Sequence, residues 1–220
     1  MKKFLYFLFA MSVTMELNAC SPDDAPTNTS STETPEEPDT SDQPDNPPPG
    51  KTLIVYYSFT NNVHTVVSDL RTQLEADVIR VEPAEKGLDY AANNYAVGST
   101  QIQAIRDNPG SASSYPSIDS VEIKFEQYTT VIIAAPLWWS SMAAPLQTFL
   151  FKHGAEMAGK QIGLIVSSAS SGISGVESDA KRLIPDGNFL TPSLWIRSSQ
   201  TSNCHSMIAE WLKDIGLTNK

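Results

Sequence analysis

Cysteine is scarce in this chain, which has only Cys20 and Cys204 among its 220 residues. Cys20 follows a basic start and an apolar run of the kind found in secretory signals, and if it carries lipid, Cys204 is the only free thiol. An intrachain disulfide is therefore excluded in the mature protein, and so is a zinc site built from CxxC pairs. The three histidines are scattered and are expected to face solvent, so we predict no metal site.

Basic residues are also few, with 15 Lys and Arg against 25 Asp and Glu and a net charge of −10. The imbalance is concentrated in residues 21–50, which contain eight acidic residues and no basic one. From Lys51 onward there are 16 acidic and 13 basic residues, so that part is only mildly acidic. Neither part has the positive surface that binding to nucleic acid requires.

The chain lacks an apolar run long enough to cross a bilayer. Its start has Lys2 and Lys3, a short apolar run over residues 4–13, and the sequence Leu-Asn-Ala-Cys ending at Cys20. This order is typical of a secretory signal, and its last four residues resemble a bacterial lipobox. We therefore expect residues 1–20 to be a lipoprotein signal peptide, with lipidation at Cys20. The alternative is an ordinary signal peptide that contains a cysteine.

Residues 21–50 contain no aromatic residue and no aliphatic residue larger than Ala. Pro, Ser, Thr, Asp and Glu dominate this segment, so it has no apolar surface to bury against the entropy cost of ordering. We predict a disordered acidic tether, followed by one domain over residues 51–220. The protein would be membrane-anchored through lipid only, on the periplasmic or cell-surface side.

Apolar runs alternate with amphipathic stretches through the rest of the chain, a pattern typical of an α/β sandwich. The runs at residues 53–57, 131–135 and 162–166 are continuous, as in central parallel strands covered on both faces. Weaker strands are expected at 76–81 and 189–196. Helices are expected at residues 63–74, at about 90–106 and at 145–154, with a loop over 107–117. A fourth helix is expected to begin at a capping box formed by Ser174 and Glu177, and a fifth at about Asn203.

Ligands of open parallel sheets bind beyond the carboxyl ends of the strands, so the three turns that follow the central strands are expected to form one site. The first, residues 58–63, has hydroxyls and amides, has no cation and leads into a helix. It suits a phosphate held by backbone N–H groups and the helix dipole, although the same residues could merely cap the helix.

The second turn, residues 136–144, contains Trp138 and Trp139 in succession. Two adjacent side chains at a strand end cannot both point into one core, so at least one should line a surface or cleft. A planar aromatic ligand suits them, while a membrane or protein interface is the alternative. The third turn, residues 167–175, is small and polar and would let backbone approach a flat heterocycle, unless it is only a flexible surface loop.

These three turns, in this order, carry a resemblance to the flavodoxin-like family. Residues 56–63 resemble its phosphate loop, residues 135–139 resemble its Pro-Ile-Trp-Trp segment, and residues 167–175 resemble its third loop. The resemblance covers residues 51–220 and is closest to short-chain forms. It implies an α/β, flavodoxin-like three-layer sandwich with a five-stranded parallel sheet in the order 2-1-3-4-5, and noncovalent FMN.

The same resemblance implies a set of FMN-binding residues and no catalytic acid or base, because the isoalloxazine carries the redox chemistry. Two residues depart from the family pattern. Asn61 replaces a Gly, but Asn tolerates left-handed backbone, and Val63 replaces a hydroxyl, so one phosphate hydrogen bond is lost. The expected cofactor-binding residues are Ser58, Phe59, Thr60, Asn61, Asn62, Val63, Pro136, Leu137, Trp138, Trp139, Ser168, Ala169, Ser170, Ser171 and Gly172.

The implied function is electron transfer or flavin-dependent reduction, as an electron carrier or an NAD(P)H-dependent quinone-type oxidoreductase with an unknown redox partner. The alternative is a binding module that keeps the fold without flavin redox activity. A hydrolase is a third possibility, since Ser174, Asp179 or Asp186, and His205 follow the chain order of α/β-hydrolases. The nucleophile elbow of that fold needs Gly two residues after the Ser, and this chain has Val176 there, which counts against a hydrolase.

Overall fold

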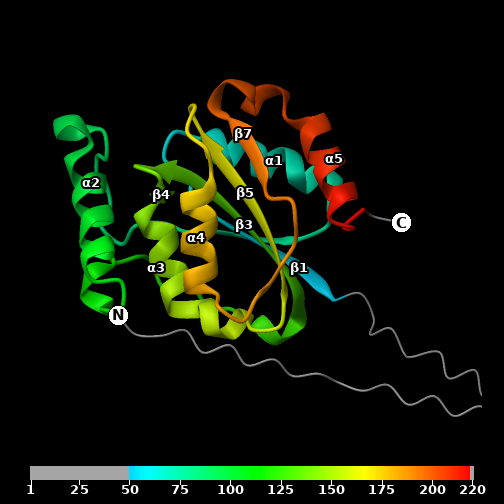
Figure 1. Ribbon diagram of the computed structural model, residues 1–220, viewed down its shortest axis with the longest axis horizontal. Helices are drawn as coiled ribbons and strands as arrows, with labels where there is room; N and C mark the ends of the chain where they lie inside the picture. Colours follow the sequence, from blue (N-terminus) through cyan, green and yellow to red (C-terminus); the bar gives the residue numbers. More distant parts are fainter. Residues whose placement is uncertain (1–49, 219–220) are drawn as a thin grey trace, which may run out of the picture. The chain divides into compact units, whose positions relative to one another are not determined.

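The computed structural model describes residues 50–218 (Figure 1). The predicted signal peptide, Cys20 and the predicted tether up to residue 49 lie outside the described residues. Among those described, no helix is long and apolar enough to cross a membrane.

A parallel sheet with the strand order β2-β1-β3-β5-β6 forms the centre of the domain. A further strand, β7, also pairs with β5, and β4 forms a short antiparallel hairpin with β3. Because β6 and β7 occupy the same edge position, the parallel part has the predicted order 2-1-3-4-5, and the predicted fold is confirmed. The strands are β1 (Lys51–Tyr56), β2 (Asp77–Arg80), β3 (Tyr128–Trp138), β4 (Ser141–Met142), β5 (Gln161–Ser168), β6 (Asn188–Phe189) and β7 (Leu194–Arg197).

The strand expected over residues 189–196 is present in the structure, but not as one piece. It is split into β6 and β7, with Pro192 between them. Proline has no backbone N–H to donate to a ladder, so it interrupts a strand or stays at an edge. The carbonyl oxygen of Pro192 instead accepts a hydrogen bond from Trp211 Nε1 at 2.8 Å.

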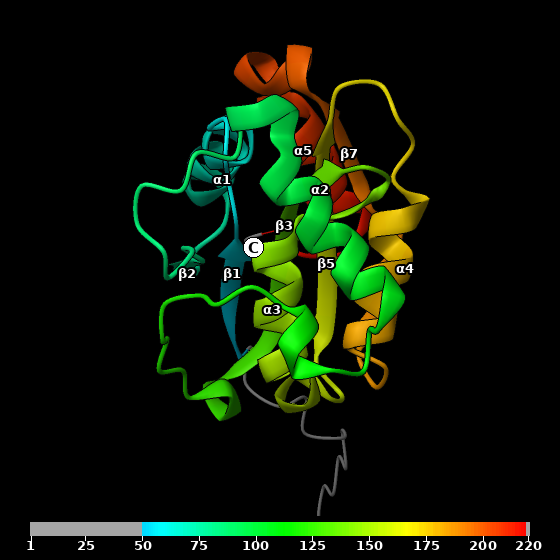
Figure 2. The same cartoon turned by 90° about the vertical axis from the view of Figure 1, so that its left-hand side faces the viewer.

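Helices cover both faces of the sheet, with α1 and α5 on one side and α3 and α4 on the other (Figures 1 and 2). Helix α2 lies against α3 and reaches the end of β3. The α-helices are α1 (Asn62–Gln73), α2 (Ala92–Asp107), α3 (Ala144–His153), α4 (Ser174–Leu183) and α5 (His205–Asp214). Short 3₁₀ turns are η1 (Ala112–Ser114), η2 (Phe125–Gln127), η3 (Gly154–Met157) and η4 (Ser198–Asn203).

Strand β1 shows why the central runs are apolar at every position. Leu53 and Val55 pack into the core beneath α3 and α4, while Ile54 and Tyr56 pack into the core beneath α1 and α5. Successive side chains of a strand point to opposite faces, so a strand covered on both sides is apolar throughout.

The predicted capping box of α4 does not form. Ile173 occupies the N-cap position, and no side chain caps the helix. Glu177 instead accepts a hydrogen bond from Ser193 Oγ at 2.7 Å. The Glu177 side chain, which the local pattern assigned to the cap, therefore contacts the segment between β6 and β7 instead.

Helix α2 lies where the sequence predicted a helix, but its first turn is irregular. Asn93, Asn94 and Tyr95 have φ values of 49°, 57° and 62°, in the left-handed region. Asn adopts this region at modest cost, whereas a bulky residue such as Tyr is strained there. The chain therefore turns sharply just before it enters the regular part of α2.

Candidate functional site

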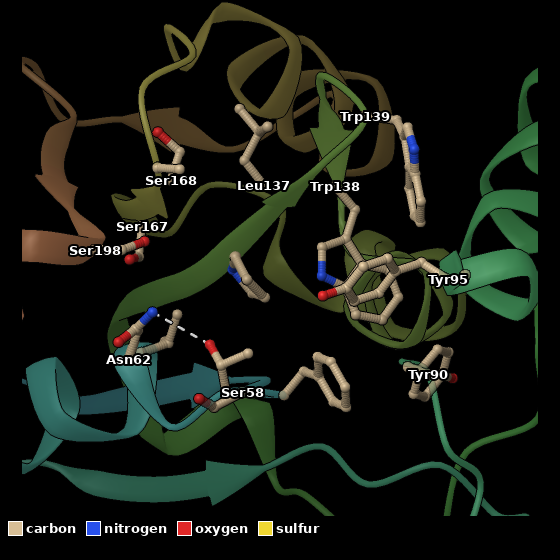
Figure 3. A pocket seen from close by; sticks show the side chains of 16 residues that line it. Ser58, Asn62, Tyr90, Tyr95, Leu137, Trp138, Trp139, Ser167, Ser168 and Ser198 are labelled. Carbon is tan, nitrogen blue, oxygen red and sulfur yellow. Dashed lines mark hydrogen bonds between the residues drawn. The ribbon is translucent and has the colours of Figure 1, made fainter. Parts of the chain in front are cut away.

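A cavity of about 440 Å³ lies at the carboxyl edge of the sheet. The turn after β1, the β3–β4 hairpin, the turn after β5, the start of η4 and the helix α2 enclose it. Its two ends differ in chemistry, with hydroxyl and amide side chains at one and aromatic rings at the other (Figure 3).

The polar end is built around the first turn of α1 and includes Ser58, Thr60 and Asn62. Ser58 Oγ accepts a hydrogen bond from the backbone N–H of His64 at 3.2 Å, and Asn62 Nδ2 donates to Thr60 Oγ1 at 3.2 Å (Figure 3). The N-cap residue itself makes no side-chain hydrogen bond, so apart from the His64 N–H, which Ser58 accepts, the first N–H groups of α1 have no partner within the helix. A helix start of this kind attracts an anion.

Asn61 is the N-cap of α1 and has a φ of 63°. The prediction that Asn would keep the left-handed turn in place of Gly is therefore confirmed. Asn61 itself does not line the cavity, and Val63 lines it with a side chain that is almost fully buried. The Val63 side chain has no hydroxyl to donate a hydrogen bond there, as the sequence analysis noted.

The aromatic end is formed by Phe59, Tyr90, Tyr95, Trp138 and Trp139. The Trp138 ring lies at its centre, with ring centroids 4.9 Å from Tyr90, 6.3 Å from Phe59 and 6.2 Å from Trp139. Tyr90 Oη donates a hydrogen bond to Gln101 Oε1 at 3.2 Å, and burial raises its pKa. Tyr95 and Trp139 are the exposed rings, at 50% and 44%.

Trp138 and Trp139 are adjacent in the chain, yet both line the same cavity. The reason is local backbone: Trp139 and Ser140 have φ values of 46° and 63°, so β3 turns back into β4 at this point. The expectation that at least one of the two rings lines a cleft is confirmed.

Two contacts hold the Trp139 hairpin in this shape. The Arg106 guanidinium, on α2, donates hydrogen bonds to the Trp139 carbonyl oxygen and, at 2.9 Å, to Ser141 Oγ. On the other side, a Cβ at Gly175 would overlap the carbonyl oxygen of Ser140. Helix α2 also approaches both indoles through Gly98, where an added Cβ would lie 3.2 Å from Trp139 and 3.3 Å from Trp138.

The comparisons with known proteins agree with this architecture. The family model described as flavodoxin matches residues 51–215. The chain belongs to the flavodoxin family. The fold is similar to that of a protein from Bacteroides eggerthii provisionally classed as a flavoprotein, with a TM-score of 0.60 and 22% identity over 76% of this chain and 98% of that one. It is also similar to a flavoprotein from Lactobacillus acidophilus solved in complex with FMN, with a TM-score of 0.56 and 20% identity over 74% and 98%. No curated protein matches the chain.

The third turn contributes less to the cavity than the sequence predicted. Ser168 and Ala169 line the cavity, but Ser170, Ser171 and Gly172 do not. Ser168 Oγ is also occupied, since it donates to the Ser171 carbonyl oxygen and accepts from Trp195 Nε1, both at 2.8 Å.

The sequence analysis did not select five of the lining residues: Tyr90, Tyr95, Gly98, Ser167 and Ser198. Ser198 follows the fourth carboxyl strand end at this edge, β7, and reading that turn with the other three would have found it. Ser167 was included in the third turn but was not selected from it. The three α2-side residues belong to the long segment between β2 and β3, which carries no motif.

The cavity lining includes no Asp, Glu, Lys, Arg or His within residues 50–218. No group of three potential metal ligands occurs in that part of the chain. The hydrolase set is dispersed: Asp179 accepts hydrogen bonds from the Met142 N–H and from Arg182, while His205 pairs with Asp69 at 3.0 Å. Helices α4 and α5, which carry Asp179 and His205, lie on opposite faces of the sheet (Figure 1).

Proposed function

We propose that this domain binds FMN noncovalently in the cavity and acts in electron transfer or as a flavin-dependent reductase. The observation that carries the proposal is the division of the cavity into a polar end and an aromatic end. FMN has the same division, with a phosphate at one end of a polyhydroxyl chain and a flat heterocycle at the other. The flavoprotein of L. acidophilus with a similar fold was solved with FMN bound.

The polar end suits a phosphate without any cation. The first N–H groups of α1, together with the Ser58 and Thr60 hydroxyls, supply donors where a dianion would bind. Neutral donors of this kind, arranged before binding, are the usual phosphate ligands at helix starts.

The aromatic end suits a planar ring. Trp138 is fixed by the rings packed edge-on or tilted around it, and Trp139 and Tyr95 remain exposed at the rim. When bound, the isoalloxazine would accept and donate the electrons, so the chain has only to bind, orient and shield it. Within the described residues the cavity has no charged lining side chain, so the chain's part in this proposal is to hold the ring rather than to transfer protons.

The proposal is tested by incubating the full-length chain with FMN, removing free ligand and recording the absorption spectrum before and after anaerobic reduction. We expect a stoichiometric yellow complex with a shifted flavin spectrum that bleaches on reduction. A colourless protein would favour the alternative, a binding module that uses the exposed Trp139 and Tyr95 for another partner. Rapid mixing of the complex with NADH or NADPH then separates a reductase, which is reduced, from a carrier, which is not.

We also propose that the domain is held at a membrane by lipid on Cys20, on the periplasmic or cell-surface side. The support is the basic and apolar start followed by the Leu-Asn-Ala-Cys sequence ending at Cys20. Metabolic labelling with a fatty acid should mark the wild type and not Cys20→Ser. Equal labelling of both would contradict lipidation.

A further inference from the structure

The backbone of the β3–β4 hairpin is strained at its turn. Trp139 and Ser140 have φ values of 46° and 63°, and neither is the glycine that this region favours. Such a conformation persists only where the surrounding structure holds it, and strain of this kind gathers at functional sites. Arg106 of α2 bonds to one side of the turn, and Gly175 of α4 packs against the other. A third set of contacts holds the strand that follows the turn.

Both backbone groups of Met142, in β4, are held by side chains from helices. Its N–H donates to Asp179 Oδ2 of α4 at 2.9 Å, and its carbonyl oxygen accepts from Gln147 Nε2 of α3 at 2.7 Å. Met142 is fully buried, so without these partners its N–H and carbonyl groups would have no water to replace them. Strand β4 is therefore fixed to α3 and α4 as well as to β3.

Arg182 joins the two side chains that hold Met142. Its Nη2 donates to Asp179 Oδ1 at 3.0 Å and to Gln147 Oε1 at 2.8 Å. Its Nη1 donates to Tyr115 Oη at 3.1 Å. With Oε1 bound to the guanidinium, the amide of Gln147 presents its nitrogen to the Met142 carbonyl oxygen. The planar, permanently charged guanidinium thus fixes the carboxylate and the amide in the orientations that bond the hairpin.

The α4 residues of this arrangement lie on one stripe of the helix. Gly175, Asp179 and Arg182 are separated by four and three residues, the spacing that places side chains on the same helical face. Helix α4 packs beside β4 (Figure 1). Gly175, Asp179 and Arg182 do not line the cavity themselves. Their influence on the cavity therefore passes through the hairpin that carries Trp139.

We propose that Asp179, Gln147 and Arg182 are positioning residues for the aromatic end of the cavity. Through the Met142 backbone they hold the hairpin in the shape that presents the Trp139 ring to the flat part of the ligand. This assignment rests on the proposed function and deepens it, because it places part of the binding specificity in side chains outside the cavity. Its signature is energetic coupling: loss of the network should weaken ring binding only while Trp139 is present.

The test compares the full-length parent with full-length Trp139→Leu, and titrates lumiflavin and FMN while following flavin fluorescence. In the parent, Asp179→Ala should weaken both ligands alike by about fivefold, because the ring that meets the isoalloxazine is no longer held. In Trp139→Leu, the same change should weaken them by less than about twofold. Equal losses in the two backgrounds, or no loss in the parent, would overturn the proposal.

Glu177→Ala is the matched control, because Glu177 lies on the same helix but bonds to Ser193 and not to the hairpin. It should leave both affinities unchanged, and a loss as large as that of Asp179→Ala would also overturn the proposal. If Asp179→Ala does not fold, Arg182→Ala takes its place. The Arg182 side chain is 34% exposed, and its removal leaves both direct partners of Met142 in the chain. The expected pattern is the same, with a loss of about threefold in the parent.

A measurement without ligand separates this proposal from the proposed function. Acrylamide quenching of tryptophan fluorescence is recorded for the parent and for Asp179→Ala, each with and without Trp139→Leu. The difference within each pair isolates the Trp139 ring, whose quenching should be steeper in Asp179→Ala because the hairpin is released. An unchanged Trp139 contribution would overturn the positioning role. If the parent binds neither flavin, the proposed function fails, while the quenching still decides whether the network positions Trp139.

Discussion

The two ends of the cavity are built by different means. At the polar end, side chains stand where regular elements meet: β1 passes into α1, β5 ends, and β7 passes into η4. At the aromatic end, the chain leaves regular structure, with left-handed backbone at Trp139 and Ser140 and again over residues 93–95. Strained backbone tends to persist where the surrounding structure holds it for a purpose. The polar end therefore follows from how regular elements meet, whereas the aromatic end depends on backbone held in the left-handed region.

The largest expected effect is at the centre of the aromatic end. Trp138 packs against Tyr57, Phe59, Tyr90 and Trp139, so Trp138→Leu loses both the stacking surface and the packing of the ring cluster. We expect FMN affinity to fall roughly a hundredfold and the melting temperature to fall by several degrees.

Trp139→Leu is the matched variant, because its ring is exposed at 44%. It should weaken FMN by about tenfold and leave the melting temperature within about 2 °C. Fluorescence titration and thermal melting measure the two quantities independently. If both variants bind and quench FMN like the parent, the aromatic end is not the flavin platform.

The polar end is tested by Thr60→Ala, which removes a hydroxyl from the turn before α1. A hydrogen bond to a charged group contributes about 1.5–3 kcal/mol, so FMN should weaken by about tenfold or more while riboflavin changes less than about twofold. Thr65→Ala is the control, because Thr65 lies one turn into α1 and its hydroxyl bonds to the Asn61 carbonyl oxygen. Equal losses of FMN and riboflavin in Thr60→Ala would place the phosphate elsewhere.

A smaller effect is expected from the start of α2. Tyr95 is half exposed at the rim, so Tyr95→Ala should weaken FMN and lumiflavin alike, by about three- to fivefold. Asn94→Gly keeps the ring and relaxes the left-handed backbone, so it should leave affinity unchanged or raise it slightly. A loss in Asn94→Gly as large as that in Tyr95→Ala would show that the backbone, and not the ring, matters.

The smallest effect is a pH dependence to which two buried tyrosines packed against Trp138 contribute. Burial raises the pKa of Tyr57 and of Tyr90 above the ordinary value of 10.0. Below pH 10 these phenols are protonated in both the folded and the unfolded chain, so they add no pH dependence there. Above it the unfolded chain releases protons that the folded chain retains, so stability should fall as pH rises. Urea unfolding between about pH 8 and 11 should show this fall, and Tyr57→Phe should reduce it.

Local rules predicted much of the polar end. The left-handed tolerance of Asn61 and the helix start after residue 61 follow from residue type and spacing, and both are confirmed. Ser167 was not selected because the sequence does not show which of the two adjacent serines at the end of β5 has its hydroxyl occupied. Only the partners of its neighbour Ser168, which are Trp195 and Ser171, make that difference visible.

The aromatic end was less predictable for a physical reason. The Trp pair was recognised as a cleft element, but its direction is set by Arg106, more than thirty residues earlier, and by Gly175, more than thirty residues later. Tyr95 lies in a segment with no motif, and only its position in space identifies it. Contacts between residues far apart in the sequence decided these details, and no local pattern records them.

Both edges of the sheet are short. Strand β2 has four residues, of which Asp77 and Arg80 are charged, and the opposite edge is divided by Pro192 into strands of two and four residues. Long, unbroken edges recruit strands from neighbouring molecules and so promote aggregation. If lipid holds many copies side by side on a membrane, their local concentration is high, and blunt edges of this kind would keep neighbouring domains from joining their sheets.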